Sequence, residues 1–410
     1  MSDERLETKR WRIAVGAVVL QMCLGSVYAW SVFTKPLMAA HPWSLTAVQG
    51  PFMLCIAMIG TSAAFGGILV DKLGPRFIAT VGSAFFGIGT LLAGVADQTG
   101  NLVLLYIGFG FIGGLGNGFG YVTPIATLIR WFPDRRGLVT GLAVMGFGLG
   151  AFFVGKIVPG MILSLDISNT FYILGLIFLV LCTASAQLFK NPPQGWLPAG
   201  FKPSEKSTSV ADSFTFAEAR KTPQWYMLWA MLCLNITAGL GLLSQLSPMA
   251  QDVLKKTLTD PSQLAVTGGL VLAIASVFNG LGRLFWAWLS DGIGRKNVFM
   301  IMFVSQAILY ILLPQIGSIV IFTVIACYLL ACYGGGFATM PAFAADSFGP
   351  AHIGRVYGIM LTAWGVAGVA GPLVFVQIKG IALYVAAGLL IVGFLISLTY
   401  NKPLSKKVKS

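Results

Sequence analysis

Arg283 is the side chain in this sequence that is best suited to bind a ligand. It lies eight residues before Asp291, within residues 264–288, whose other members are uncharged and mostly apolar. A guanidinium group stays protonated and is costly to place in lipid, so it needs a counter-anion. We interpret Arg283 as the anchor of a carboxylate substrate. The alternative is a structural pair with a backbone carbonyl or with Asn279.

Three further side chains are expected near the depth of Arg283. Helix rise places Tyr121, nine residues before Arg130, and Arg283 roughly 12 to 14 Å from the same membrane surface. Trp364 reaches a similar level on another helix, and Asn117 lies one turn from Tyr121 on the same helical face. We expect Tyr121 and Asn117 to donate hydrogen bonds to the carboxylate and Trp364 to wall off one side. The alternative is that these side chains only pack between helices.

Tyr28 and Tyr333 are aromatic residues with a polar tip in glycine-rich runs. We expect them to line the substrate cavity or to close it as a gate, and interfacial or packing roles are the alternative. Lys156 has two interpretations: its long side chain extends to the outer membrane surface, or it faces the cavity as a second cation. The six cysteines form no CxxC motif and have no histidine nearby, so we expect packing roles, no metal and no cofactor.

The elements that position these residues are membrane helices. Of 410 residues, 56% are hydrophobic and only 10% are charged, which exceeds what a soluble core can bury. A span needs roughly 20 apolar residues. Charged or Pro/Gly-rich breaks divide the chain into twelve such runs, at residues 11–33, 46–70, 77–96, 102–129, 138–163, 170–189, 225–247, 264–289, 298–316, 318–345, 356–377 and 382–399.

The basic residues predict the orientation of these spans. With both termini in the cytoplasm, 21 of the 27 Lys and Arg residues lie on the inner side, as the positive-inside rule requires. The net charge of +13 is then explained by lipid headgroups rather than by nucleic acid. We expect a multi-pass protein of the plasma (inner) membrane, and a monomer.

The sequence contains an internal repeat. Asp71 and Asp291 lie 220 residues apart in similar loops, and three glycines and a proline recur at a shift of 217. This predicts an all-α protein of two pseudo-symmetric six-helix bundles, residues 1–189 and 224–410, joined by a cytoplasmic linker at residues 190–223. We expect Asp71 with Arg76, and Asp291 with Lys296, to latch helix ends.

The segment G-x-L-x-D-x-x-G-x-R at residues 67–76 resembles the signature loop of the major facilitator superfamily. Within it, the chain is similar to the oxalate/formate antiporter family, which is related to the monocarboxylate transporters. That resemblance rests on the segments YAWSVF at residues 28–33, RWFPDRRG at 130–137, NPPQGW at 191–196, KTPQW at 221–225 and FNG at 278–280. It implies that Arg283 is the carboxylate-binding arginine of the eighth span, residues 264–289.

Two departures from the family pattern bear on the substrate. Trp364 stands where the oxalate exchanger has a lysine, so we expect one cation in the site and a small monocarboxylate such as lactate, pyruvate or formate. Asn279 stands where the monocarboxylate transporters have an aspartate, which argues against their route of proton coupling. We nevertheless rank proton symport ahead of anion exchange of the oxalate/formate type, because a bare anion enters against an inside-negative potential.

Other functional classes fit less well. The sequence has no G-x-x-x-x-G-K-[ST] segment for an ATP-driven pump, and no cluster of titratable residues at one depth for an enzyme. A carboxylate sensor that does not transport is the alternative of a different class. We therefore expect a secondary transporter whose partners are a small carboxylate anion, a proton and membrane lipid.

Overall fold

The computed structural model describes residues 3–193, 196–198, 213–255, 257–349, 352–378 and 380–403, and these residues form helices without any strand. Twelve of the helical segments are long and apolar enough to span a membrane. The predicted all-α class with twelve spans is therefore confirmed. Most predicted ends lie within a few residues of the observed ones, whereas the seventh span runs to Leu254 and not to residue 247.

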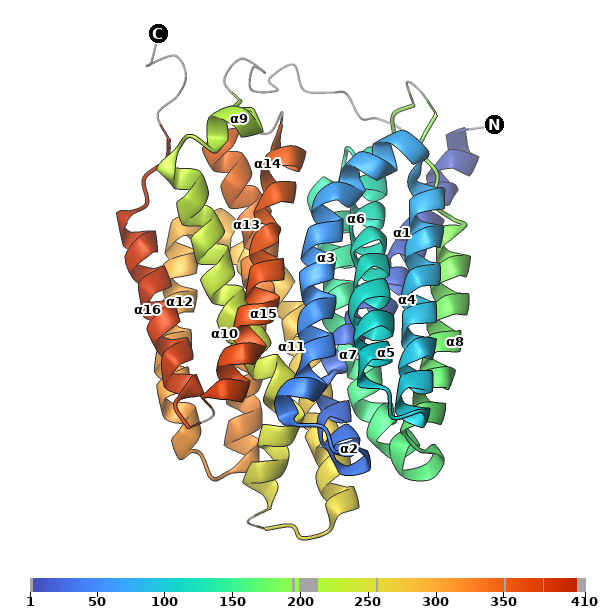
Figure 1. Ribbon diagram of the computed structural model, residues 1–410. Coiled ribbons are helices and arrows are strands. Elements are labelled where there is room, and N and C mark those ends of the chain that lie inside the picture. The colour runs from blue at the N-terminus through green and yellow to red at the C-terminus, as the bar shows by residue number, and fades with distance from the viewer. Residues whose placement is uncertain are drawn as a thin grey trace.

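The first six spans form one group of helices (Figure 1). Its elements are α1 (Asp3–Gly25), η1 (Ser26–Ala29), α2 (Ser31–Ala40), α3 (Leu45–Leu73), α4 (Pro75–Gln98), α5 (Leu102–Leu105), the π-helical η2 (Tyr106–Gly113), α6 (Gly114–Trp131), α7 (Arg136–Leu165) and α8 (Ile167–Ala186). The fourth span is thus built from three consecutive helical segments, α5, η2 and α6.

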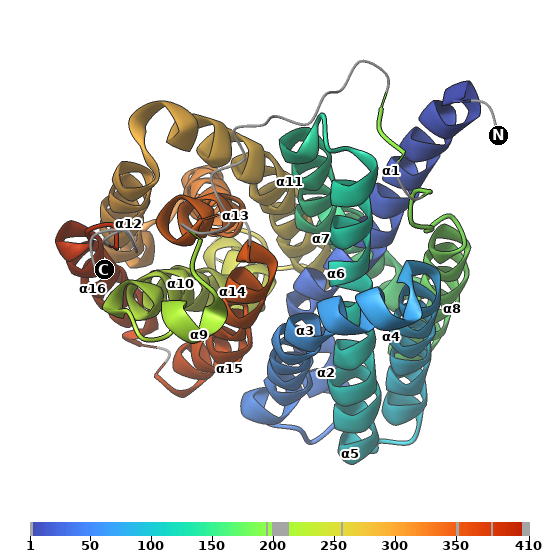
Figure 2. The same ribbon diagram turned by 90° about the horizontal axis from the view of Figure 1, so that it is seen from above.

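The last six spans form the second group. Its elements are α9 (Phe216–Ala219), α10 (Pro223–Leu254), α11 (Pro261–Ile293), α12 (Arg295–Leu312), η4 (Leu313–Gln315), α13 (Ile319–Phe348), α14 (Ile353–Met360), α15 (Thr362–Gln377) and α16 (Ala382–Thr399). Viewed along the helices, the two groups lie side by side (Figure 2). We call them the first and second bundle.

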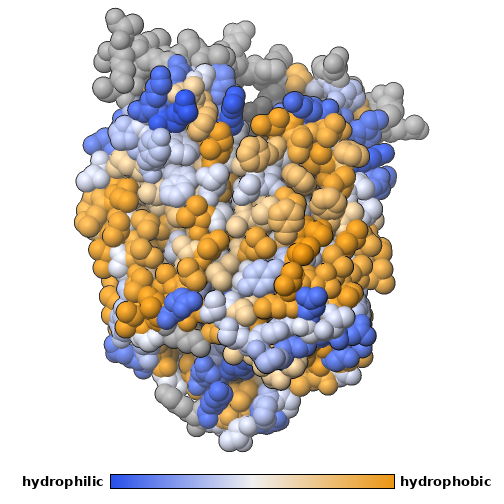
Figure 3. Space-filling model, viewed as in Figure 1, coloured by the Kyte–Doolittle hydropathy of each residue, from blue (hydrophilic) through white to orange (hydrophobic). Residues whose placement is uncertain are grey.

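The start of α1 and the end of α16 lie at the same end of the molecule, uppermost in Figure 1. We call this the terminal end and the other the opposite end. Between them, apolar side chains cover much of the visible surface, with polar ones gathered toward both ends (Figure 3). Large side chains such as Val103, Trp288 and Val320 are at least 66% exposed. Lipid solvates such a surface directly, as expected of a multi-pass membrane protein.

The repeated loops adopt the same backbone conformation. Gly74, between α3 and α4, has φ 85° and ψ 154°, and Gly294, between α11 and α12, has φ 91° and ψ 145°. Side chains with a Cβ rarely adopt such positive φ values, so glycine is required at both positions. The similarity of the two loops in the sequence thus corresponds to a shared geometry.

The predicted partners within these loops are wrong. Asp71 pairs with Arg130 at the end of α6, not with Arg76. Asp291 pairs with Arg295, which also approaches Asp346 of α13 at 3.3 Å. Both ion pairs join helix ends within one bundle. Arg130 comes from the end of α6, whereas Arg295 is the residue directly before Lys296 at the start of α12.

Lys296 has a different role from the expected one. Its ammonium group donates to the main-chain oxygens of Leu398 and Tyr400, both at 2.9 Å. It therefore caps the end of α16, where a positive charge is favoured by the free carbonyl groups.

The two bundles are held together at the opposite end. Lys35 of α2 lies 3.0 Å from Asp252 of α10 and 3.4 Å from the oxygen of Pro248. Gln49 of α3 donates to the oxygen of Ser244 at 3.1 Å. At the terminal end, by contrast, a Cβ added at Gly354 or Gly358 would meet no atom of the described residues within 4 Å. The bundles are therefore closed against each other at the opposite end.

Candidate functional site

Arg283 of α11 is buried between the two bundles, with 2% of its surface exposed. Its Nε donates to Oδ1 of Asn279, one turn earlier, at 3.4 Å, whereas Nη1 has no hydrogen-bond partner. None of the ion pairs among the described residues includes Arg283. The guanidinium group is therefore a buried charge without a carboxylate partner in the described part of the chain.

Glycines allow the neighbouring helices to approach this arginine closely. A Cβ at Gly334 of α13 would lie 2.5 Å from Oδ1 of Asn279 and 3.0 Å from Cγ of Arg283. A Cβ at Gly148 of α7, in the first bundle, would lie 3.1 Å from Nε of Arg283 and 2.8 Å from Cα of Gly280. Larger residues would push α7 and α13 away from the guanidinium group, so these glycines position it between the bundles.

Aromatic rings surround the guanidinium group. Cζ of Arg283 lies 5.3 Å from the ring centre of Phe337 of α13, a cation–π distance. The Phe337 ring contacts Trp364 of α15 at 5.0 Å, and Trp364 contacts Tyr121 of α6 at 5.1 Å. The Trp364 indole is 1% exposed and its Nε1 has no hydrogen-bond partner. Two buried N–H groups of this site, one on Arg283 and one on Trp364, thus lack an acceptor.

The rings continue across the first bundle. Phe147 of α7 lies 5.2 Å from Tyr121 and 5.1 Å from Tyr28 of η1, measured between ring centres. Tyr333 of α13 donates a hydrogen bond of 2.6 Å to the hydroxyl of Tyr28. Tyr28, Tyr121 and Tyr333 all interact electrostatically with Arg283. We call Arg283 and these six rings the arginine cage.

The structure thus brings together most of the residues expected at the site. Arg283, Asn279, Tyr121, Trp364, Tyr28 and Tyr333 all belong to the cage or contact it directly. They come from η1 and α6 of the first bundle and from α11, α13 and α15 of the second. A ligand held here would touch both bundles.

Asn117 differs from the expectation. Its amide donates to the oxygen of Leu24 of α1 at 2.8 Å, and the side chain is fully buried. The donor that we expected to serve a carboxylate is therefore engaged in joining α6 to α1, because α1 passes directly over that face of α6.

Three residues near Arg283 were missed in the sequence. Phe337 follows Tyr333 by four residues and Tyr357 precedes Trp364 by seven, and both spacings place the pairs on common helical faces. Tyr357 also interacts electrostatically with Arg283. Those spacings could have indicated Phe337 and Tyr357 from the sequence. Phe147, one of many phenylalanines, carried no comparable signal.

Lys156 lies away from the cage. Its side chain is exposed on the face of α7 that also carries Phe153 and Ile157, which are 49% and 52% exposed. A face with such exposed apolar side chains is directed toward lipid, so the interpretation as an outward-extending lysine fits this placement.

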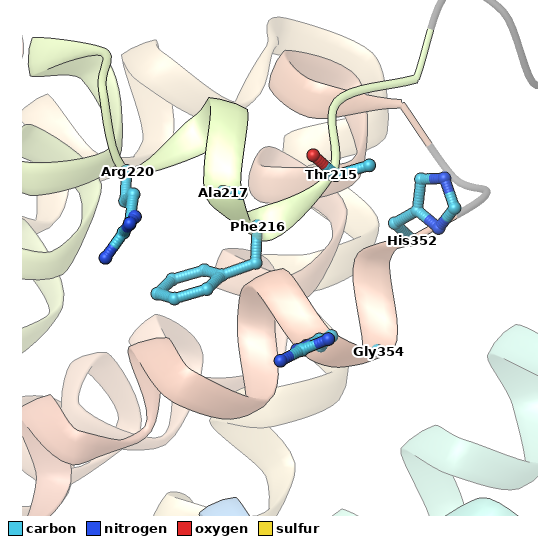
Figure 4. Close-up of a pocket in the computed structure, with 7 residues that line it drawn as sticks. Thr215, Phe216, Ala217, Arg220, His352 and Gly354 are labelled. Carbon is cyan, nitrogen blue, oxygen red and sulfur yellow. The ribbon is translucent and has the colours of Figure 1, made fainter.

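Two hollows of the surface lie elsewhere. Figure 4 shows one of about 690 Å³ at the terminal end, where Phe216, Arg220, His352 and Arg355 lie around it. It shares no residue with the arginine cage. Within the described chain the cysteines are unpaired, and no group of His, Cys, Asp and Glu side chains has the arrangement of a metal site.

The arginine cage has the chemistry of an anion site. A carboxylate carries two acceptor oxygens and one negative charge. It would supply acceptors to the unpartnered Nη1 of Arg283 and Nε1 of Trp364 and would neutralise the guanidinium group. The ring faces would contact the apolar part of a small ligand.

Comparison with known proteins agrees with this architecture. The family model of the Major Facilitator Superfamily matches residues 15–372. The oxalate:formate antiporter of Oxalobacter formigenes is 30% identical over 88% of this chain and 83% of its own length. Apicoplast pyruvate carrier 1 of Toxoplasma gondii is 27% identical over 72% of this chain and 63% of its own.

A solved structure shares the fold. It is a bacterial homologue of the human lysosomal transporter Spinster, in an inward-facing and unoccupied conformation. The TM-score is 0.70 at 13% identity, and the match covers 96% of this chain and 98% of the other.

Proposed function

This chain belongs to the Major Facilitator Superfamily, and from that premise we propose that it carries a small monocarboxylate, such as lactate, pyruvate or formate, across the plasma membrane. Membership of this family makes the chain a multi-pass membrane transporter and not an enzyme. The substrate, the coupling and the orientation are our inference.

The observation that carries the proposal is the buried Arg283 with its unpartnered Nη1. An arginine that served only packing would be expected to satisfy its N–H groups on carbonyl or carboxylate oxygens. Arg283 has instead only neutral groups around it, namely the amide oxygen of Asn279, the hydroxyl groups of Tyr28 and Tyr121, and a shell of aromatic rings. A carboxylate anion would complete this shell in both charge and hydrogen bonding.

One negative charge on the substrate matches one cation in the site. Trp364, which occupies the position where a second cation would be expected in an oxalate carrier, is neutral, and the exposed Lys156 lies outside the cage. A dicarboxylate would leave its second charge buried without a partner, which is strongly unfavourable. This supports a monocarboxylate.

We infer that the terminal end is cytoplasmic, since the loops assigned to it hold 21 of the 27 basic residues. The contacts of Lys35 and Gln49 with α10 then close the extracellular side. Transport proceeds as the two bundles, taken as residues 1–189 and 224–410 with residues 190–223 as their linker, rock about the arginine cage.

Proton symport is the coupling that we propose. Import of a bare monoanion against the membrane potential costs about 2.3 kcal/mol per 100 mV, which a co-transported proton removes. No carboxylate pairs with Arg283 among the described residues. We therefore assign the coupling to the substrate's own carboxylate, which enters the site together with a proton.

Anion exchange is the second candidate. It is favoured by the neutral Asn279, one turn from Arg283, and by the similarity to the oxalate:formate antiporter. In exchange, the arginine would be neutralised by an anion in each direction, and no proton would be needed.

Counterflow in proteoliposomes tests the proposal. Radiolabelled lactate, pyruvate, formate and oxalate are offered to the wild type, Arg283→Lys and Arg283→Gln, with Lys156→Gln as the matched loss of a cation outside the cage. We expect monocarboxylate counterflow that both Arg283 variants lose and Lys156→Gln keeps. Undiminished uptake by Arg283→Gln would refute the anchor role.

Imposed gradients separate the two kinds of coupling. Uptake into anion-free vesicles that accelerates with an inward proton gradient indicates symport. Uptake that ignores the proton gradient and requires internal carboxylate indicates exchange.

A further inference from the structure

A cluster of basic side chains lies at the terminal end of the first bundle. A surface hollow of about 690 Å³ is lined by four basic residues together with Thr8, Ile13, Gln187 and Leu188. The basic residues are Lys9 and Arg12 of α1, Arg76 of α4, and Lys190, which follows α8. We call this the basic hollow. Figure 2 shows α1, α4 and α8 within the first bundle.

The four cations of the basic hollow have no carboxylate partner among the described residues, whereas other basic residues at the terminal end do. Arg10 pairs with Glu7 and Asp134, and Arg130 and Arg295 pair with aspartates. Like charges that line one hollow repel each other, so an anion that enters it is favoured.

The lack of a partner is clearest for Arg76 when it is compared with Lys296, its counterpart in the repeat. Lys296, 220 residues later, donates both of its hydrogen bonds to main-chain oxygens at the end of α16. Arg76 occupies the same position next to α8, the sixth span of the first bundle, yet its side chain makes no hydrogen bond or ion pair within the described chain and lines the basic hollow. Its guanidinium group is therefore available to a ligand.

The surface next to the hollow is apolar and directed outward. Val15 of α1, Phe77 of α4 and Leu188 are 64%, 57% and 42% exposed. The helices are fixed to one another here, since Gln187 donates to the hydroxyl of Thr80 at 3.1 Å. A Cβ at Gly16 of α1 would lie 2.8 Å from the Leu188 side chain. Cations at the rim of an exposed apolar surface match a phosphate headgroup followed by acyl chains.

We propose that the basic hollow binds an anionic phospholipid. The phosphate lies among Arg12, Arg76 and the two lysines, and an acyl chain follows the exposed apolar side chains of Val15, Phe77 and Leu188. Free phosphate shares the headgroup chemistry but gains nothing from the apolar surface, so the lipid binds more tightly. This inference is independent of the substrate of the arginine cage.

Native mass spectrometry of the full chain from mixed micelles tests this. The protein is titrated with dioleoyl phosphatidylglycerol, with dioleoyl phosphatidylcholine and with inorganic phosphate. The double variant Arg12→Gln/Arg76→Gln is compared with Lys72→Gln/Lys221→Gln, which removes two exposed cations of the terminal end that do not line the hollow.

We expect the Arg12/Arg76 variant to bind phosphatidylglycerol about tenfold more weakly than the wild type and the lysine control, with no change for phosphatidylcholine. Single variants at Arg12 and Arg76, each with a smaller loss, replace the double variant if it does not fold. Equal affinity of all variants for phosphatidylglycerol would overturn the proposal. Inorganic phosphate bound as tightly as the lipid would also overturn it and would identify a site for soluble anions.

Discussion

The hydroxyl groups of Tyr333 and Tyr28 lie 2.6 Å apart and join α13 of the second bundle to η1 of the first. Both side chains are almost fully buried, and both interact electrostatically with Arg283. The bond therefore couples the arginine cage to the contact between the bundles. An anion that draws either hydroxyl toward itself would weaken that contact.

Tyr333→Phe is expected to shift the protein toward the state that is open at the opposite end. The loss of one hydrogen bond is worth about 1 kcal/mol, or about a fivefold change in the ratio of the two states. Spin labels at Met38 and Thr257, measured by pulsed electron resonance, report the distance between the bundles.

Tyr310→Phe is the control for this measurement, because Tyr310 donates to the oxygen of Ala238 within the second bundle. The same distance distribution in Tyr333→Phe and the wild type would contradict a coupling role for the tyrosine pair.

Lys35→Glu is expected to open the opposite end by placing like charges together at Asp252. The wild-type pair is exposed to solvent, so its own contribution is small, about 0.2 to 1 kcal/mol, and decreases with salt. In an Asp252→Asn background, which also removes the contact of Asp252 with Lys255, Lys35→Glu should change the label distance much less at low salt. An equal change in both backgrounds would show that the ion pair does not hold the ends together.

Asn117→Ala is expected to lower thermal stability, because it removes the buried hydrogen bond from α6 to the Leu24 oxygen of α1. The cost is about 1 to 3 kcal/mol. The KM for substrate should change little in counterflow, unlike that of any active Arg283 variant. An unchanged melting temperature together with a much higher KM would mean that Asn117 contacts the substrate after all.

Asp71 is expected to couple energetically to Arg130 and not to Arg76. A double-mutant cycle with Asp71→Asn and Arg130→Gln, measured by thermal unfolding, should give a coupling of up to about 1 kcal/mol, in view of the solvent exposure of both groups. The matched cycle with Arg76→Gln should give none. Coupling in the second cycle and not in the first would restore the pairing expected from the sequence.

The sequence was sufficient for the properties that depend on local composition. Runs of about 20 apolar residues must be helices in lipid, since every backbone group must be hydrogen-bonded there. The repeated loops with Gly74 and Gly294 predicted the duplication because a positive φ restricts the residue type at that position. The depth of Arg283, Tyr121 and Trp364 followed from helix rise alone.

The tertiary structure decided which side chains meet. Spacing along the chain pointed Asp71 to Arg76 and Asn117 to a substrate, whereas the folded chain presents Arg130 to the first and Leu24 to the second. Which partners from distant helices meet depends on how those helices rotate and pack. Glycines such as Gly148 and Gly334 allow α7 and α13 to lie close to Arg283. The sequence therefore determined the membrane architecture and the depth of the buried Arg283. Long-range packing alone surrounded Arg283 with aromatic rings and with no carboxylate of the described chain.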